Sequence, residues 1–231
     1  MKNEKKITIF IGNMGSGKSE IAINYTFGLM KSSSKPVKLL DLDIIKPYIR
    51  IRDIADTLVK EGLDLLLPDK KIRHADMPII PADMTKYLYD PSYDLVIDVG
   101  GEDRGSITIA QFKDQFADFD VKTYVVINAM RPFSNTPEKI VTGMKELSHL
   151  SKLSIDGIIA NSHLRFLSSL QEVEEGLIII QKASDLIGTP IYKVAVWDKL
   201  MDKPLPEKLS EYSIMPLKIH LMFPWEKTNS L

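Results

Sequence analysis

The sequence contains no cysteine. Disulfide bonds, zinc sites built on thiolates and cysteine-ligated iron–sulfur clusters are therefore excluded. An excess of charge of one sign is also missing, because 30 basic residues are balanced by 31 acidic residues and the net charge is −1. Such a balance provides no general attraction to nucleic acid or to an anionic membrane. The composition thus gives no strong case for a nucleic-acid partner.

Long apolar runs are absent as well. The first apolar run, Ile7–Ile11, is too short for the core of a signal peptide, and it leads into a polar, glycine-rich turn. No stretch approaches the roughly 20 apolar residues that a membrane-spanning helix needs. These observations predict a cytoplasmic protein without a transmembrane segment.

Short runs rich in isoleucine and valine alternate with longer stretches of helical periodicity. The short runs predict buried parallel strands at Ile7–Ile11, Val37–Leu42, Leu95–Val99, Lys122–Asn128, Gly157–Asn161 and Ile191–Val196. Helices are predicted at Lys18–Lys31, Arg50–Glu61, Ile107–Phe116, Pro137–Leu147 and Ser168–Leu186. This alternation predicts an α/β fold, with an open, mostly parallel sheet and helices on both faces. Ligands bind such sheets where loops leave the carboxyl ends of the strands.

The length of 231 residues and the 44% of hydrophobic residues fit one domain covering residues 1–231. Residues 63–90 fit the alternation less well and predict an irregular connection with one short strand at Leu63–Leu67. The tail, about residues 203–231, is rich in proline, and we expect it to pack on the domain. The tail side chains expected to make this contact are Ile219, Leu221, Phe223 and Trp225.

The first predicted strand leads into a phosphate-binding loop. The motif G-x-x-x-x-G-K-[ST] is matched at every required position by Gly12-Asn13-Met14-Gly15-Ser16-Gly17-Lys18-Ser19. Glycines let the backbone curl so that successive N–H groups point at a polyphosphate, and the following helix directs its positive end there. Lys18 is expected to reach the β and γ phosphates, and the Ser19 hydroxyl to bind Mg²⁺. The predicted nucleotide contacts are residues 12–19 together with Glu20.

Two further predicted strands carry aspartate near their ends. Asp43 follows the strand at Val37–Leu42, where it is placed to meet Mg²⁺ or an attacking water. Asp98 lies one position before the end of a later strand and is expected to hold a magnesium-bound water. Gly100, which follows it, leaves room for the γ-phosphate. We predict that the loop from Asp98 to Gly105 changes shape when the γ-phosphate leaves.

These three motifs together resemble the MinD/ParA/CobQ/CobB branch of P-loop NTPases, in the SIMIBI class, from about Ile7 to Val196. The resemblance implies an ATPase whose Asp43 acts on the hydrolytic water and Mg²⁺ and whose Gly100 approaches the γ-phosphate. It also implies that Asn161, at the end of a late strand, contacts adenine. No Asn-Lys-x-Asp element for guanine is present, which favours ATP over GTP.

The sequence departs from this branch in the phosphate loop. Many members carry a second lysine there, which reaches across an ATP-dependent dimer to the partner's nucleotide, and Asn13 stands in its place. Metal-inserting and iron–sulfur members use cysteines at their dimer interface, and this chain has none. The resemblance therefore does not carry dimer-coupled hydrolysis by that lysine over to this chain.

The sequence favours a slow Mg²⁺-dependent ATPase that binds ATP or ADP and acts as a switch for a protein partner or within a homodimer. Two alternatives stay open. The first is an ATP-dependent ligase or kinase for a small molecule, similar to dethiobiotin synthetase or the cobyrinate amidating enzymes. In that case Arg50, Arg131 and Arg165 would line the substrate pocket. The second is a scaffold that binds ATP without hydrolysing it.

Overall fold

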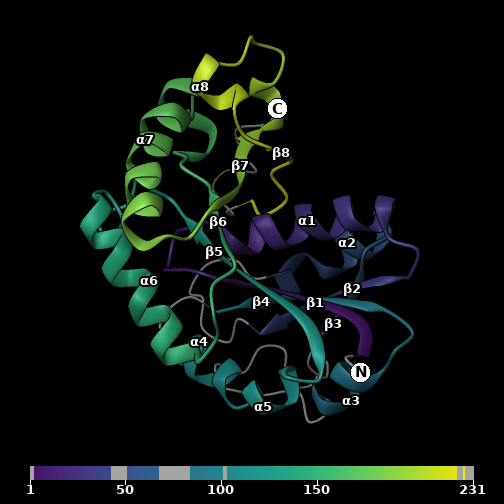
Figure 1. Ribbon diagram of the computed structural model, residues 1–231. Coiled ribbons are helices and arrows are strands. Elements are labelled where there is room, and N and C mark those ends of the chain that lie inside the picture. The colour runs from purple at the N-terminus through teal and green to yellow at the C-terminus, as the bar shows by residue number, and fades with distance from the viewer. Residues whose placement is uncertain (1–2, 43–50, 68–83, 101–102, 223–225, 227–231) are drawn as a thin grey trace.

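The computed structural model describes residues 3–42, 51–67, 84–100, 103–222 and 226. Within these ranges the chain forms an eight-stranded sheet in the order β3-β2-β4-β1-β5-β6-β7-β8 (Figure 1). All neighbouring strands are parallel. The strands are β1 (Asn3–Ile11), β2 (Val37–Leu42), β3 (Asp64–Leu66), β4 (Asp94–Val99), β5 (Phe119–Ile127), β6 (Gly157–Ala160), β7 (Ile191–Trp197) and β8 (Ile214–Leu217). The predicted parallel α/β sheet is confirmed.

Helices cover both faces of the sheet (Figure 1). One core cluster contains Phe10 and Val96 with side chains of α1 and α2, and the other contains Ile9 and Ile97 with side chains of α4, α6 and α7. Consecutive strand residues therefore point to opposite faces, and both faces are buried. The helices are α1 (Lys18–Ser32), α2 (Ala55–Lys60), α3 (Met84–Tyr89), α4 (Asp103–Ala110), α5 (Lys113–Phe116), α6 (Pro137–Ser151), α7 (Leu170–Ile187) and α8 (Glu207–Ser210), with 3₁₀ turns η1 (Ile51–Ile54), η2 (Arg165–Leu167) and η3 (Asp198–Leu200).

Two long helices begin and end on local signals in the sequence. The Thr136 hydroxyl accepts a hydrogen bond from the Lys139 N–H and so caps the start of α6. At the start of α7, Ser169 and Glu172 form a capping box. Gly188 ends that helix in the left-handed region, with φ of 73°. None of the described helices is both long and apolar enough to cross a membrane.

Several elements differ from the predictions. The stretch Ile107–Phe116 is divided between α4 and α5, because the chain turns at Phe112, whose ring packs in the core. The stretch predicted as one helix from Arg50 begins instead as η1 before α2. α3 and β8 were not predicted. β8 lies in the proline-rich tail, and it tolerates Pro216 because it is an edge strand, where a missing N–H can face away from the sheet.

The tail packs on the domain through the residues that the structure describes. Leu221 belongs to the core cluster on the side of α1, and Ile219 lines a cavity together with Leu217 and Leu221. The predictions for Asp43, Arg50, Phe223 and Trp225 concern residues outside the described ranges.

Two glycines in helices test how closely the elements pack. A Cβ on Gly176 of α7 would lie 2.0 Å from Ser162 Oγ and 2.3 Å from Ser162 Cβ, whereas a Cβ on Gly28 of α1 would meet nothing within 4 Å. We expect Gly176→Ala to lower the free energy of unfolding by about 1–3 kcal/mol, since the helix must move away. Gly28→Ala is expected to raise it by up to about 1 kcal/mol. Urea unfolding measures both changes in the free energy of unfolding, and changes of the same sign in the two variants would contradict this packing.

Candidate functional site

The phosphate loop leaves the centre of the sheet. β1 lies between β4 and β5, and the loop joins it to the first residue of α1, Lys18. Gly15 and Gly17 have φ of 76° and 85°, in the left-handed region that favours glycine. Gly12 passes close to β5, since a Cβ there would lie 2.6 Å from the carbonyl oxygen of Val126. The glycines of the motif are thus required by backbone conformation and by close approach.

Side chains that follow two neighbouring strands donate hydrogen bonds to backbone carbonyls of the phosphate loop. The Asn161 side-chain amide, after β6, donates to the carbonyl of Ser16 at 2.7 Å. The Arg131 Nε, after β5, donates to the carbonyl of Gly15 at 3.3 Å. These two carbonyls are therefore directed outward, toward Asn161 and Arg131. Asn161, predicted to contact adenine, is placed at the wall of the adjoining cavity with its amide on the loop backbone.

Asn128 connects the same strand ends and was not predicted as a site residue. Its amide nitrogen donates to the carbonyl of His163 at 3.1 Å, and its side-chain oxygen accepts the His163 N–H at 3.2 Å. It also donates to the carbonyl of Gly15 at 3.4 Å. The asparagine is visible in the sequence as the end of a predicted strand, but its partners are far away in the chain.

The residues expected to contact phosphate and metal are buried at the carboxyl ends of the central strands, in and next to the phosphate loop. Lys18 and Ser19 are each 2% exposed, and the buried Ser16 hydroxyl has no hydrogen-bond partner among the described residues. Asp98 is fully buried on β4, beside Phe10 of β1. A hydroxyl and a carboxylate suit Mg²⁺, which takes its other ligands from water and phosphate. The described residues hold no ready-made cluster of three metal-binding side chains, and a nucleotide-bound Mg²⁺ does not need one.

The remaining predicted contacts are distributed around the loop. Asn13 points toward α6, since a Cβ on Gly143 would lie 3.4 Å from its amide nitrogen, and Met14 is 52% exposed. Gly100 is buried, and a Cβ on Gly105 would lie 2.2 Å from its carbonyl oxygen. Gly105, in α4, therefore has to be a glycine because of this close approach, which no sequence motif indicates.

Asp41 is also buried on β2, next to the position of Asp98 on β4. Its carboxylate pairs with the Arg52 guanidinium at 3.3 Å, and both side chains are almost inaccessible. Arg52 lies within the stretch predicted as a helix from Arg50. The structure places its guanidinium inside, where it balances the charge of Asp41.

A cavity of about 350 Å³ lies beside the phosphate loop, at the ends of β6, β7 and β8. Its polar wall contains Gly17, Lys18, Ser19, Glu20 and Asn161, together with both Arg131 and Arg165. Its apolar wall contains Val173, Trp197, Leu200, Leu217, Ile219 and Leu221. A concave, mainly apolar site with a few polar groups at one end suits a planar organic group attached to an anion.

His163 lies in the cavity wall as a neutral side chain. Burial, and then the positive charges of Arg131 and Arg165, lower the pKa of its imidazole to about 4. Its Nδ1 accepts the Arg165 N–H at 3.2 Å, so the neutral ring carries its proton on Nε2. That nitrogen is near Gly17, because a Cβ there would approach it to 3.1 Å. The ring therefore presents a hydrogen-bond donor beside the loop at neutral pH.

This pKa makes the stability depend on pH. Since the folded-state pKa lies below the ordinary value of 6.5, the unfolded chain binds more protons in that window, and stability falls as the pH drops from 6.5 to 4. We expect this group to remove up to about 3 kcal/mol of stability. Urea unfolding at pH 7 and pH 4.5 should show a smaller loss for His163→Asn than for the wild type. His149→Asn is the matched control, because His149 is an exposed histidine on α6. An equal loss of stability between pH 7 and pH 4.5 in the wild type and both variants would contradict the prediction.

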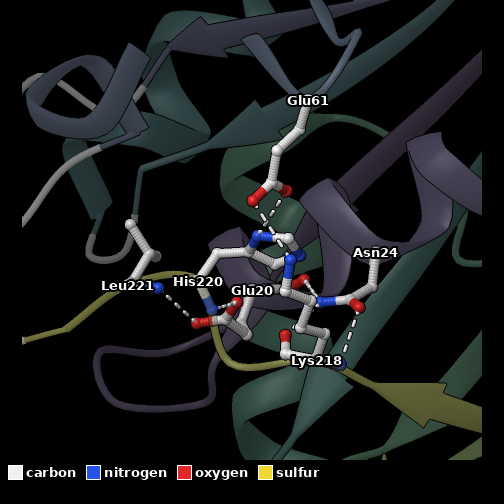
Figure 2. Close-up of polar contacts among 6 residues, drawn as sticks. All are labelled: Glu20, Asn24, Glu61, Lys218, His220 and Leu221. Atoms are coloured by element: carbon white, nitrogen blue, oxygen red, sulfur yellow. Dashed lines mark hydrogen bonds and ion pairs between the residues drawn. The ribbon is translucent and has the colours of Figure 1, made fainter. Parts of the chain in front are cut away.

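Glu20, predicted as a nucleotide contact, also makes contacts with the tail that the sequence did not predict. Its carboxylate oxygens accept the backbone N–H groups of His220 at 2.7 Å and of Leu221 at 3.1 Å (Figure 2). It lines the cavity as well. Glu20 therefore joins the first turn of α1 to the tail at the rim of the site.

Solved structures share this fold at low sequence identity. FtsY from Mycoplasma mycoides matches with a TM-score of 0.57 and 17% identity, over 90% of this chain and 65% of that chain. The fold is that of the P-loop NTPases. FtsY from Thermotoga maritima has a TM-score of 0.55 and 15% identity, over 89% and 68% of the two chains. Chloroplast FtsY from Physcomitrella patens has a TM-score of 0.59 and 11% identity, over 90% and 64%.

This likeness is one of fold alone, because the sequence identities lie between 11% and 17%. The chain spans about 65% of the length of the Mycoplasma protein. No protein-family model and no curated protein matches the sequence. The resemblance to the MinD/ParA-like branch therefore stays a prediction from the motifs.

Proposed function

We propose that this protein binds ATP or ADP with Mg²⁺ at residues 12–20 and acts as a slow ATPase that switches a protein partner or a homodimer. The observation that carries the proposal is the loop between β1 and α1. Gly15 and Gly17 have positive φ, and the two backbone carbonyls between them accept hydrogen bonds from Arg131 and Asn161. Lys18 follows Gly17 directly, at the start of α1. This arrangement supports binding of a polyphosphate by backbone N–H groups.

Each part of the site then has a role. The loop N–H groups and Lys18 balance the charge of the phosphates, and the Ser19 hydroxyl and Asp98 hold Mg²⁺. The bound Mg²⁺ withdraws charge from the phosphate oxygens. Asp43 orients the attacking water, and Gly100 approaches the γ-phosphate. Gly100 and Gly105 pack closely on each other, so a small change at the phosphate would be passed from Gly100 to the start of α4.

The cavity supports a nucleotide rather than a simple polyphosphate. Asn161 and the aromatic residue Trp197 both line it, together with several aliphatic side chains. Aromatic and aliphatic groups of this kind suit the flat, weakly polar base and sugar of a nucleotide. We propose ATP over GTP on the sequence argument, and the choice between them is decided by titration.

A ligase or kinase for a small molecule is a second candidate. Arg131 and Arg165 line the same cavity as the phosphate loop, which would allow them to bind an anionic substrate next to the nucleotide. Under this candidate, ATP turnover rises sharply when one small acid is added. Under the scaffold candidate, ATP binds tightly and no turnover is measured.

Calorimetric titration with ATP, ADP and GTP, with and without Mg²⁺, tests the proposal. Light scattering after size exclusion on the same samples reports whether ATP changes the mass. We expect ATP and ADP to bind, GTP to bind more weakly, and Asp43→Ala to bind ATP but hydrolyse it more slowly. Absence of binding by any nucleotide would refute nucleotide binding, and hydrolysis by Asp43→Ala at the wild-type rate would refute the role of Asp43.

A further inference from the structure

The tail segment Lys218–Leu221, here called the strap, lies along α1 immediately after β8 (Figure 2). The Asn24 side chain of α1 donates to the Lys218 carbonyl and accepts the Lys218 N–H, both at 2.9 Å. The Glu20 carboxylate accepts hydrogen bonds from the N–H groups of His220 and Leu221. Three of the four backbone N–H groups of the strap therefore end on side chains of α1.

The opposite end of the strap is held by Arg165, in the segment after β6. Its Nη2 donates to the Leu221 carbonyl at 2.8 Å. The guanidinium also forms a two-point pair with Glu226, through Nε at 2.8 Å and Nη2 at 2.7 Å. Two parallel charge-assisted bonds of this kind fix direction as well as position. The strap is thus attached both to the helix that follows the phosphate loop and to the segment that carries His163.

Side chains of the strap make further contacts with α1 and α2. The His220 ring stacks on Phe27 with 5.5 Å between centroids, and its Nδ1 lies 3.5 Å from Glu61 (Figure 2). Glu61 also pairs with Lys218 at 3.1 Å, at the exposed surface. The exposed ion pair contributes little by itself. The bonds to Glu20, Asn24 and Arg165 are therefore the ones on which docking of the strap depends.

The strap is also a wall of the cavity. Ile219 and Leu221 line it, and so do their anchors Glu20 and Arg165. With the strap in place the cavity measures about 350 Å³, within the range of roughly 300–1,000 Å³ found for sites that bury small organic ligands. A ligand that fills the cavity therefore contacts the docked strap and does not need to displace it.

We infer that the strap closes the nucleoside side of the site, and that nucleotide binding and strap docking stabilise each other. The inference rests on the proposed function, because the ligand is a nucleotide. Glu20 follows Ser19 directly, so one turn of α1 carries both a predicted phosphate contact and a strap anchor. A ligand that binds the docked form better than the undocked form shifts the population toward docking, and docking raises its affinity by the same factor.

Hydrogen exchange of the strap tests the inference directly. The N–H groups of Lys218, His220 and Leu221 all donate to α1, so their exchange reports docking. We expect saturating Mg²⁺–ATP to slow exchange in a peptide covering these residues at least threefold. Exchange that is equal with and without ATP, in a protein that binds ATP by calorimetry, would overturn the inference.

Two variants loosen opposite ends of the strap without touching the phosphate loop. Asn24→Ala removes both bonds to Lys218, and Glu226→Gln weakens the pair with Arg165. Each is expected to weaken ATP binding about tenfold, which corresponds to one or two hydrogen bonds. Ser32→Ala is the matched control, because it removes a single exposed hydrogen bond at the far end of α1.

The outcomes separate the two proposals. If the wild type binds no nucleotide, the proposed function and the inference are both refuted. If ATP binds and both strap variants bind it like Ser32→Ala, the inference alone is refuted. Weaker binding by both variants, with faster exchange of the strap in each, supports the coupling even if one of them is also less stable.

Discussion

Replacing Lys18 with alanine is expected to weaken ATP binding by about 30- to 150-fold, since a hydrogen bond to a charged group contributes about 2–3 kcal/mol. Lys18 is the first residue of α1 and is 2% exposed, so its position beside the loop is fixed by packing. The lost charge acts on the β and γ phosphates, so ATP should lose more affinity than AMP. Calorimetric titration with both nucleotides measures the difference.

The same substitution should leave the fold intact. Lys18 stands at the first position of α1, and alanine has the highest helix propensity. Thermal unfolding of Lys18→Ala without nucleotide measures any effect on the fold separately from the lost phosphate contact. Lys31→Ala, at the exposed end of the same helix, is the control for removal of a positive charge from α1. Equal affinity of ATP for the two variants would show that Lys18 does not contact the phosphates.

Replacing Gly17 with alanine is expected to abolish measurable ATP binding. Gly17 has a positive φ of 85°, and a Cβ there would lie 2.4 Å from the Asn161 amide nitrogen. That nitrogen donates to Ser16, so the clash removes the bond that holds the loop from behind. The backbone conformation itself costs about 1–2 kcal/mol for a residue with a Cβ. Calorimetry with ATP and urea unfolding measure the two consequences separately.

Gly15→Ala is the matched control for this variant. Gly15 also has a positive φ, of 76°, but a Cβ there would lie 3.3 Å from Nε of Arg131, a flexible side chain that can move. It should suffer the backbone cost and keep the bond between Asn161 and Ser16. If Gly15→Ala and Gly17→Ala lose the same affinity, the contact with Asn161 is not what shapes the loop.

The core of the fold follows directly from the sequence. A strand buried on both faces needs a continuous apolar run, and such runs locate β2, β4, β6 and β7 to within one residue. β1 starts at Asn3, before the apolar run that predicted it at Ile7. β8 was not predicted, because Pro216 and the neighbouring prolines usually indicate a loop. Only its position at the edge of the sheet, which the sequence does not state, makes a strand with proline acceptable there.

The candidate site could be predicted only where its residues are neighbours in the chain. The phosphate loop is continuous, so its motif identifies it. The support from Asn128 and Asn161 joins positions more than a hundred residues apart, and no local pattern encodes those partners. The tail contact of Glu20 is hidden for the same reason, since its partners are backbone N–H groups of residues 220 and 221.

The central place of β1 in the sheet also governs how the chain folds during its synthesis. Ile7 lies beside Leu95 on one side and Val121 on the other, so β1 is made roughly 90 residues before its first neighbour. At a translation rate of about 5–20 residues per second, the apolar strand remains without either neighbour for roughly 5–20 s. Pairing between strands so far apart in the chain is slow, and the unpaired apolar strand is prone to aggregation until it forms. The apolar strand β1 therefore stays without its pairing partners until β4 and β5 have left the ribosome.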